Sequence, residues 1–219
     1  LRFFIKDDPE AILLLELRNY TEDDLNLQII TLLNRLSKTG LSYAQPVLKG
    51  EDIEKAMQLR KAGLGLLGNL NGDKKAVACI EDTAVAIQDL SNYITKFTAL
   101  MKRYDQQAVY YAHAGAGELH LRPILNLKKA TDVNLFKAIT TDVAKLVKSY
   151  NGSMSGEHGD GRLRAEFIEY MVGSECYNLF RTIKETFDPK NIFNKGKIID
   201  APPMESALRY VPERKEPQI

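Results

Sequence analysis

The first fifty residues combine two hydrophobic patterns. Residues 11–17 form an almost continuous apolar run, which predicts a buried strand. Residues 21–39 predict a helix, because Thr21 can cap its start, acidic residues follow, and Gly40 can end it. The apolar stripe predicted to face the core comprises Leu25, Ile29, Leu32 and Leu36. Pro46 lies within residues 41–48, which favours an edge strand there.

The rest of the chain alternates between strand and helix patterns. We expect helices over residues 51–62 and 83–104, a glycine-rich loop over 63–75 and a strand over 76–81. Further elements are expected as strands over 109–112 and 118–122, helices over 132–150, 163–171 and 175–187, and a glycine-dense loop over 151–162. This order predicts an α+β fold, with an antiparallel sheet that carries helices on one face and a helical segment after it.

Composition narrows the class of protein. The 219 residues include 30 Lys and Arg against 29 Asp and Glu, and this balance does not indicate a nucleic-acid partner. No apolar run approaches the roughly 18 residues that a membrane span needs. The two cysteines, Cys79 and Cys176, are far apart, which argues against a disulfide framework and fits a reducing compartment such as the cytoplasm. Because the chain begins at Leu1, we expect it to be a piece of a longer protein.

All three histidines lie in two glycine-rich segments. In the first, a symmetric hairpin turn over residues 113–120 would place His113 opposite His120, where two imidazoles can share a divalent metal. Strand alternation would put Glu118 and His120 on this polar face and the neighbouring leucines on the other. Two hairpin histidines that only stack or hydrogen-bond are the alternative.

The second segment, residues 155–161, surrounds Glu157 and His158 with glycines. Such a run favours a sharp loop over a helix, because glycine allows positive φ and close approach to a ligand. Glu157 is a candidate third metal ligand, which would leave coordination positions open for a substrate. His158 is a candidate general base. An anion-binding loop or a plain surface loop is the alternative.

Several motifs resemble the C-terminal domain of FAD-linked oxidases and dehydrogenases, a group that includes D-lactate dehydrogenases, the glycolate oxidase flavin subunit and D-2-hydroxyglutarate dehydrogenases. The family pattern H-x-G-x-G-x-L-H is matched over residues 113–120, S-G-E-H-G-x-G over 155–161, and D-P-x-x-x-x-N-x-G-K over 188–197. Residues 81–86 resemble the E-D-x-A-V-P stretch. The H-L-R-P variant over 120–123 resembles one branch in which an iron–sulfur domain follows the flavoprotein unit.

The resemblance implies a ferredoxin-like cap domain over residues 1–125, a helical segment of the same C-terminal domain over 126–200, and an extended tail over 201–219. FAD would be bound mainly by an N-terminal domain outside this chain, so no cofactor-binding residue is assigned here. An iron–sulfur cluster would belong to a domain downstream. This fragment alone is expected to be inactive in redox chemistry.

The resemblance also implies roles for single residues. His113, His120 and Glu157 match the ligands of a divalent metal, usually zinc, and His158 matches the catalytic base. Arg60 matches an arginine that binds the substrate carboxylate. Among the departures from the family, Met57 replaces a Trp, and Glu118 replaces the Asn common before Leu-His.

The function expected from the resemblance is oxidation of a D-2-hydroxy acid of the lactate, glycolate or 2-hydroxyglutarate class, by hydride transfer to flavin while a metal polarises the substrate. The expected partners are this acid, the FAD domain of the parent and a downstream electron acceptor, which could attach the protein peripherally to the inner membrane. A metal-dependent hydrolase and a ferredoxin-like interaction module without catalysis are the alternatives.

Overall fold

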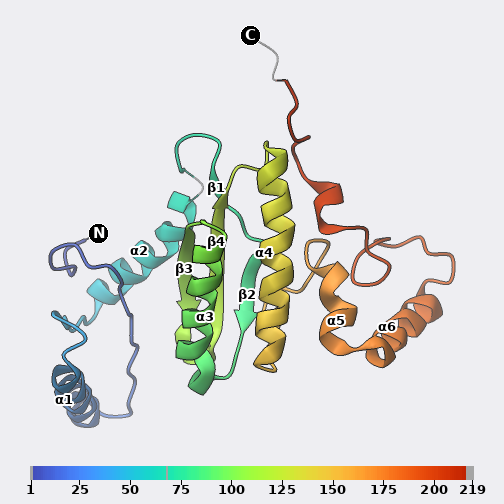
Figure 1. Cartoon of the computed structure of the whole chain (residues 1–219). Helices are drawn as coiled ribbons and strands as arrows, with labels where there is room; N and C mark the ends of the chain where they lie inside the picture. Colours follow the sequence, from blue (N-terminus) through green and yellow to red (C-terminus); the bar gives the residue numbers. More distant parts are fainter. Residues whose placement is uncertain (1, 68, 216–219) are drawn as a thin grey trace. The chain divides into compact units, whose positions relative to one another are not determined.

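The computed structural model describes residues 2–67 and 69–215 and divides into two compact units, Leu1–Leu66 and Leu67–Ile219 (Figure 1). The first unit holds α1 (Glu22–Thr39) and nearly all of α2 (Glu51–Leu67). The second holds a four-stranded sheet and the remaining helices. The domain boundaries expected after residues 125 and 200 stay a prediction.

The ends of α1 follow the predicted signals. The Thr21 hydroxyl accepts the main-chain N–H of Asp24, and Gly40 adopts the left-handed conformation at φ 64°. The predicted core stripe is wrong, because α1 has no buried residue and its four stripe residues are only partly covered. A helix in a unit with one other helix and no sheet has little apolar surface to pack against.

Two predicted strands are also wrong. Residues 11–17 and 41–48 contain no strand, and the side chains of residues 12–15 are exposed. A strand needs a paired neighbour for its main-chain groups, and the described part of the first unit offers no strand that could pair. The predicted loop after residue 62 begins late, because α2 continues through Gly63 and Gly65 to Leu67.

The predicted antiparallel sheet is present, with β4 (Glu118–Leu125) at its centre. On one side β4 pairs with β3 (Ala108–His113), and on the other with β2 (Ile80–Ala84) and β1 (Lys75–Ala76), always antiparallel. The single strand predicted over 76–81 is therefore two short strands that flank a turn.

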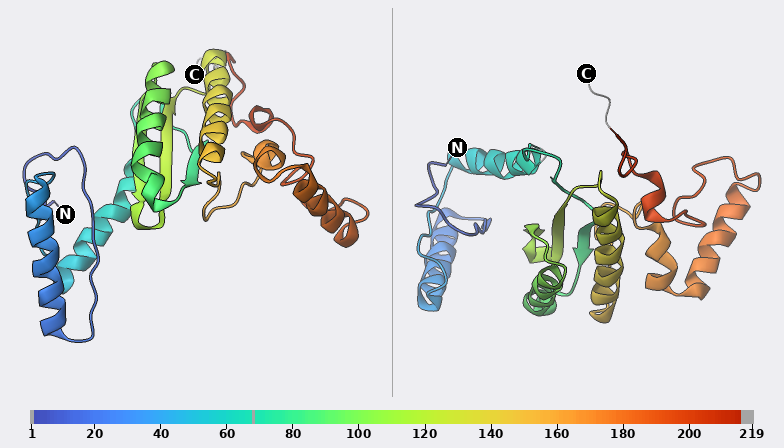
Figure 2. Two further views of the ribbon diagram at one scale, coloured as in Figure 1. Left: turned by 60° about the horizontal axis from the view of Figure 1, so that its bottom comes forward. Right: turned by 45° about the horizontal axis from the view of Figure 1, so that its top comes forward.

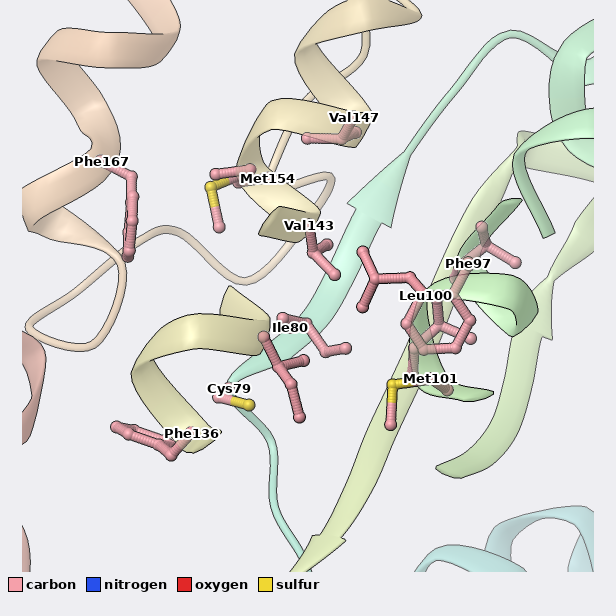
Figure 3. Packing of buried hydrophobic residues seen from close by; sticks show 14 of the residues in the cluster. Cys79, Ile80, Phe97, Leu100, Met101, Phe136, Val143, Val147, Met154 and Phe167 are labelled. Carbon is pink, nitrogen blue, oxygen red and sulfur yellow. The ribbon is translucent and has the colours of Figure 1, made fainter. Parts of the chain in front are cut away.

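One face of this sheet is covered by α3 (Leu90–Arg103) and α4 (Ala130–Ser149), which lie side by side (Figures 1 and 2). The predicted helix over 83–104 starts only at Leu90, after the short 3-10 turn η1 (Ile87–Asp89), because the residues before it belong to β2. Figure 3 shows Phe97 and Met101 of α3 and Val143 of α4 packed around Ile80. The leucines of β4 complete this core, so the opposite face of β4 is left for polar residues.

The chain after α4 forms the glycine-dense loop, then η3 (Ala165–Phe167), α5 (Ile168–Val172), α6 (Ser174–Phe187) and η4 (Met204–Ala207). Ala165, Ile168, Tyr177 and Ile199 form a second, smaller core. The molecule therefore has the predicted α+β fold with a C-terminal helical segment. Among the described residues, none of the helices combines the length and apolar character that crossing a membrane requires.

Candidate metal and catalytic site

The hairpin between β3 and β4 carries two of the three histidines. Its connection is the 3-10 turn η2 (Ala114–Ala116) followed by Gly117 at φ 73°. The predicted register is wrong: His113 faces Glu118, and His120 faces Tyr111. The connection comprises the four residues 114–117 and is centred one residue earlier than the predicted turn, which shifts the pairing by two residues.

A shift of two residues leaves every side chain on its predicted face of the sheet. His113 and His120 are therefore diagonal neighbours on the polar face, with ring centroids 5.2 Å apart. Leu119 and Leu121 point into the core, as predicted. The two imidazoles lie close enough to bind one ion, although they are not directly opposed.

The glycine-dense loop brings Glu157 and His158 to these histidines. Glu157 Oε1 lies 3.7 Å from His113 Nε2, 3.7 Å from His120 Nε2 and 3.3 Å from His158 Nε2. The His158 ring stacks on His120 at 5.3 Å with an interplanar angle of 15°. The four residues singled out from the sequence thus converge in one place. His113, Glu157 and His158 are each about half-exposed, which leaves the site open on one side.

Asp82 holds this loop in place from within the sheet. It sits at a β-bulge in β2 with φ 83°, and its side chain is fully buried. Its carboxylate accepts the main-chain N–H groups of Glu157 at 2.9 Å and of His158 at 2.8 Å, and the Ser155 hydroxyl at 2.9 Å. The Asp82 carbonyl also accepts the N–H of Gly156 at 2.8 Å. A single buried aspartate therefore fixes the backbone beneath the candidate ligand and the candidate base.

Arg164 also holds this loop in place. Its buried guanidinium donates to the Gly159 carbonyl at 2.7 Å and to the Glu81 carbonyl, and lies 3.5 Å from Asp82 Oδ2. Asp160 lies 3.6 Å from Arg164 Nε. The positive charge compensates the buried carboxylate, which would be costly to bury alone.

Asp82 and Glu118 have neighbouring carboxyl groups, and each changes the pKa of the other. Burial alone would raise the pKa of Asp82, but the hydrogen bonds it accepts from Glu118 and from the loop outweigh burial and lower this pKa to about 2. Burial raises the pKa of Glu118 to about 7, together with its hydrogen bond to Asp82 and the charge of Glu157. Asp82 therefore carries the negative charge of the pair near neutral pH.

The other edge of the His120 ring faces Glu81. Glu81 Oε1 lies 3.7 Å from His120 Nδ1 and accepts a hydrogen bond from Arg122 Nη2 at 2.7 Å. Burial lowers the pKa of His120, so its imidazole is neutral near pH 7. If Nε2 bound a metal, the Nδ1–H would point toward Glu81, which is the usual support for a metal-bound histidine.

The donor set fits a divalent metal ion. Three groups have ligand atoms within 4.8 Å of one another: His113, His120 and Glu157; Glu81, His120 and His158; and Asp82, Glu157 and His158. The first is the set expected from the sequence. Two imidazoles and a carboxylate on an open face suit zinc or a similar ion with a position left for a substrate. Glu118 Oε1 and His120 Nδ1 are buried atoms without a hydrogen-bond partner among the described residues, as in a site built around a further group.

Arg60 is the remaining residue predicted to belong to the site. It lies in α2 and belongs to the first compact unit, whereas the histidines belong to the second. Its role in substrate binding stays a prediction.

The sequence reading gave no role in the site to Asp82, Glu81 or Arg164, which hold the cluster together. A partial signal existed, since Glu81 and Asp82 open a stretch that matches the family. The partners of Glu81 lie 39 to 83 residues further along the chain, as in its contacts with His120 and Arg164. No spacing rule connects residues that far apart.

Comparison with known proteins identifies the family. Residues 3–198 match the model for the C-terminal domain of FAD linked oxidases. The chain is 35% identical to the D-2-hydroxyglutarate dehydrogenase of Haemophilus influenzae over 203 residues, which is 88% of this chain and 20% of that protein. It is 38% identical to the enzyme of the same name from Escherichia coli K12 over 158 residues, covering 70% of this chain and 15% of that protein.

A more distant relative has a different name. The glycolate oxidase subunit GlcD of Bacillus subtilis is 25% identical over 157 residues, covering 72% of this chain and 32% of that protein. The chain thus spans about a fifth or less of the length of the first two relatives. With the match over residues 3–198, the chain belongs to the family of C-terminal domains of FAD-linked oxidases.

Proposed function

We propose that this chain is the substrate-covering part of an FAD-dependent dehydrogenase or oxidase that acts on a D-2-hydroxy acid. The observation that carries the proposal is the convergence of His113, His120, Glu157 and His158 from a hairpin and a distant loop. The family match and the names of the relatives support flavin chemistry and a 2-hydroxy acid as substrate.

In this proposal, His113, His120 and Glu157 hold a divalent ion, with zinc as the first candidate. Such an ion would polarise the hydroxyl and carboxylate of a chelated substrate and so favour loss of the hydroxyl proton. The chain's contribution is to keep the His120 imidazole neutral and the Glu157 carboxylate in place. Burial of His120 and the Asp82 hydrogen bond to the Glu157 main chain serve these two purposes.

His158 is the proposed general base. Its ring stacks on His120 beside the proposed ligands, and its main chain is fixed by Asp82. A base in this place would take the hydroxyl proton of the substrate while the hydrogen on C2 leaves as hydride. The hydride acceptor would be FAD bound mainly by another part of the parent protein, and a downstream electron acceptor would reoxidise it.

Arg60 is proposed to bind a carboxylate of the substrate, as the resemblance implies. A guanidinium can hold a carboxylate through two parallel hydrogen bonds. In the full-length parent, Arg60→Ala should raise KM at least tenfold. The neighbouring Lys61→Ala serves as the control, because it removes an exposed positive charge from the same helix. An unchanged KM for Arg60→Ala would remove Arg60 from the site.

The hydrolase alternative lacks a supporting observation. The family match is to flavin-linked oxidases, and the metal-binding geometry serves either chemistry. The proposal of an interaction module without catalysis would require that the clustered histidines have no role, although their ligand atoms lie within 4.8 Å of one another.

The test of the proposed function is flavin reduction in the full-length parent. Under anaerobic conditions, rapid mixing with D-2-hydroxyglutarate, D-lactate or glycolate should bleach the flavin absorbance with at least one of them. His158→Asn should slow this step by about 10²–10⁴-fold, the usual contribution of a general base. Bleaching at the wild-type rate would remove His158 as base, and no bleaching by any 2-hydroxy acid would contradict the proposed substrate class.

A further inference from the structure

Glu118 occupies an unusual position beside the proposed metal site. It is the first residue of β4, pairs with His113 across the hairpin, and shares the polar face with His120. The Cγ of Glu118 would lie only 3.3 Å from a Cβ added at Gly156, so the loop that carries Glu157 packs directly onto it. Glu118 therefore lies where the hairpin and the loop meet.

The carboxyl group of Glu118 is almost completely buried. The carboxyl group is hydrogen-bonded to Asp82. Its Oε1, however, is buried without a hydrogen-bond partner among the described residues, and the side chain is only 10% exposed. A buried acceptor without a partner costs free energy unless another group completes the site.

Oε1 of Glu118 is close to one of the proposed ligand atoms. It lies 4.0 Å from His120 Nε2, the same ring nitrogen that lies 3.7 Å from Glu157 Oε1. Two atoms bound to one zinc ion at about 2.1 Å can be at most about 4.2 Å apart. The distance between Glu118 Oε1 and His120 Nε2 falls within this limit, so an ion bound to His120 Nε2 lies within reach of Glu118 Oε1.

We propose that Glu118 is a fourth protein ligand of the metal and binds it through Oε1, an inference that rests on the metal site of the proposed function. The site then has two histidines and two carboxylates. A second anionic oxygen should strengthen binding of divalent ions, and should favour Mn²⁺ in particular, because carboxylate oxygen suits this harder ion.

The test measures metal affinity of the chain itself. Zn²⁺ and Mn²⁺ are titrated into the wild type and Glu118→Gln, with a chromogenic chelator as competitor for Zn²⁺ and electron paramagnetic resonance to follow free Mn²⁺. Glu118→Gln keeps the shape of the side chain but cannot give an anionic oxygen to a metal ion. We expect Kd for Zn²⁺ to rise at least tenfold and Kd for Mn²⁺ to rise by a larger factor. Glu175→Gln, an exposed change in α6, is the control and should alter neither.

The outcomes separate this inference from the function on which it rests. If the wild type binds neither ion, the metal site fails, and this inference fails with it. If the wild type binds zinc and Glu118→Gln binds it equally well, the inference is wrong while the three-residue site stands. Should Glu118→Gln not fold, a crystal structure of the zinc-loaded wild type decides: a Glu118 oxygen at about 2.0–2.2 Å from zinc supports the proposal, and one beyond 3 Å overturns it.

Discussion

The carboxylate of Asp82 accepts the main-chain N–H of His158 at 2.8 Å, across 76 residues of sequence. A β-bulge turns this aspartate out of the regular ladder of β2, and the positive φ of 83° is uncommon for a residue other than glycine. The strained backbone is stabilised by the hydrogen bonds that the side chain then makes. The proposed base is therefore positioned by the sheet and not by its own flexible loop.

Replacement of Asp82 should loosen the site and destabilise the fold. In Asp82→Asn, one carboxylate oxygen becomes an amide that cannot accept the N–H and O–H groups now directed at it. We expect the free energy of unfolding in urea to fall by about 2–3 kcal/mol. Zinc affinity should fall as well, because Glu157 is no longer fixed.

Asp73→Asn is the matched control for this change. Asp73 forms an exposed ion pair with Lys128 at 3.0 Å, and such surface pairs contribute less than about 1 kcal/mol. Equal losses of stability in the two variants would contradict the role given to Asp82.

Gly117 should be far less replaceable than Gly115 in the same turn. Gly117 has φ 73°, and an added Cβ would lie 2.0 Å from the Val85 carbonyl oxygen. Gly115 has ordinary φ and nothing within 4 Å of such an atom. Gly117→Ala should therefore lower the free energy of unfolding by well over about 1 kcal/mol, whereas Gly115→Ala should change it by less than about 0.5 kcal/mol. Equal effects would show that the turn does not close against the Val85 main chain.

The hairpin illustrates what the sequence could and could not predict. Alternation of Leu119 and Leu121 with His120 predicted which face of β4 is polar, and the place of both leucines in the hydrophobic core confirms it. The register was predicted wrongly, because it depends on a left-handed residue at Gly117 that pattern alone does not locate. The convergence of the two histidine segments was predicted from the metal-binding chemistry of their residues and from the family motifs. Their support by Asp82 and Arg164 was not predicted, because it depends on contacts between distant parts of the chain.

In the first unit, a hydrophobic pattern led to a wrong prediction. The apolar run over residues 11–17 has the composition of a buried strand, yet it lies exposed and unpaired with any strand in the part of the chain that the structure describes. A hydrophobic pattern indicates that a segment tends to be buried. It does not predict which other part of the protein buries that segment. The helix caps of α1, which are local interactions, were predicted correctly at both ends.

Asp188 should make stability depend on pH in the acid range. A hydrogen bond from Lys184 and the main-chain N–H groups of Ile192 and Phe193 lower its pKa from 3.8 to about 2. A pKa lower in the folded than in the unfolded state means that the ionised form stabilises the fold. This contribution is complete above about pH 4 and is lost as pH falls toward 2.

The measurement compares urea unfolding of the wild type and Asp188→Asn between pH 6 and the lowest pH at which both remain folded. The wild type should be more stable at pH 6, and the difference should shrink as pH falls below 4. A difference that stays constant down to pH 2.5 would contradict a contribution from the ionised carboxylate.

Glu81 should influence metal binding without contact to the ion. Its carboxylate lies 3.7 Å from His120 Nδ1 and is held by Arg122. In Glu81→Gln, the acceptor that orients the ring is weakened, and zinc affinity should fall by about 10–100-fold. Glu205→Gln removes a carboxylate paired with Lys137 on α4 and should leave zinc affinity unchanged. Equal affinities of Glu81→Gln and the wild type would show that Glu81 does not orient His120.

X-ray absorption at the zinc edge tests the central claim most directly, because it counts imidazole ligands on the bound ion. In the chain loaded with one equivalent of zinc, we expect the scattering of two histidines with Zn–N distances of about 2.0–2.1 Å and additional oxygen neighbours. His113→Ala should leave the signal of one histidine. A spectrum of the wild type without imidazole scattering, or one that is identical in His113→Ala, would contradict a metal site built from the two segments.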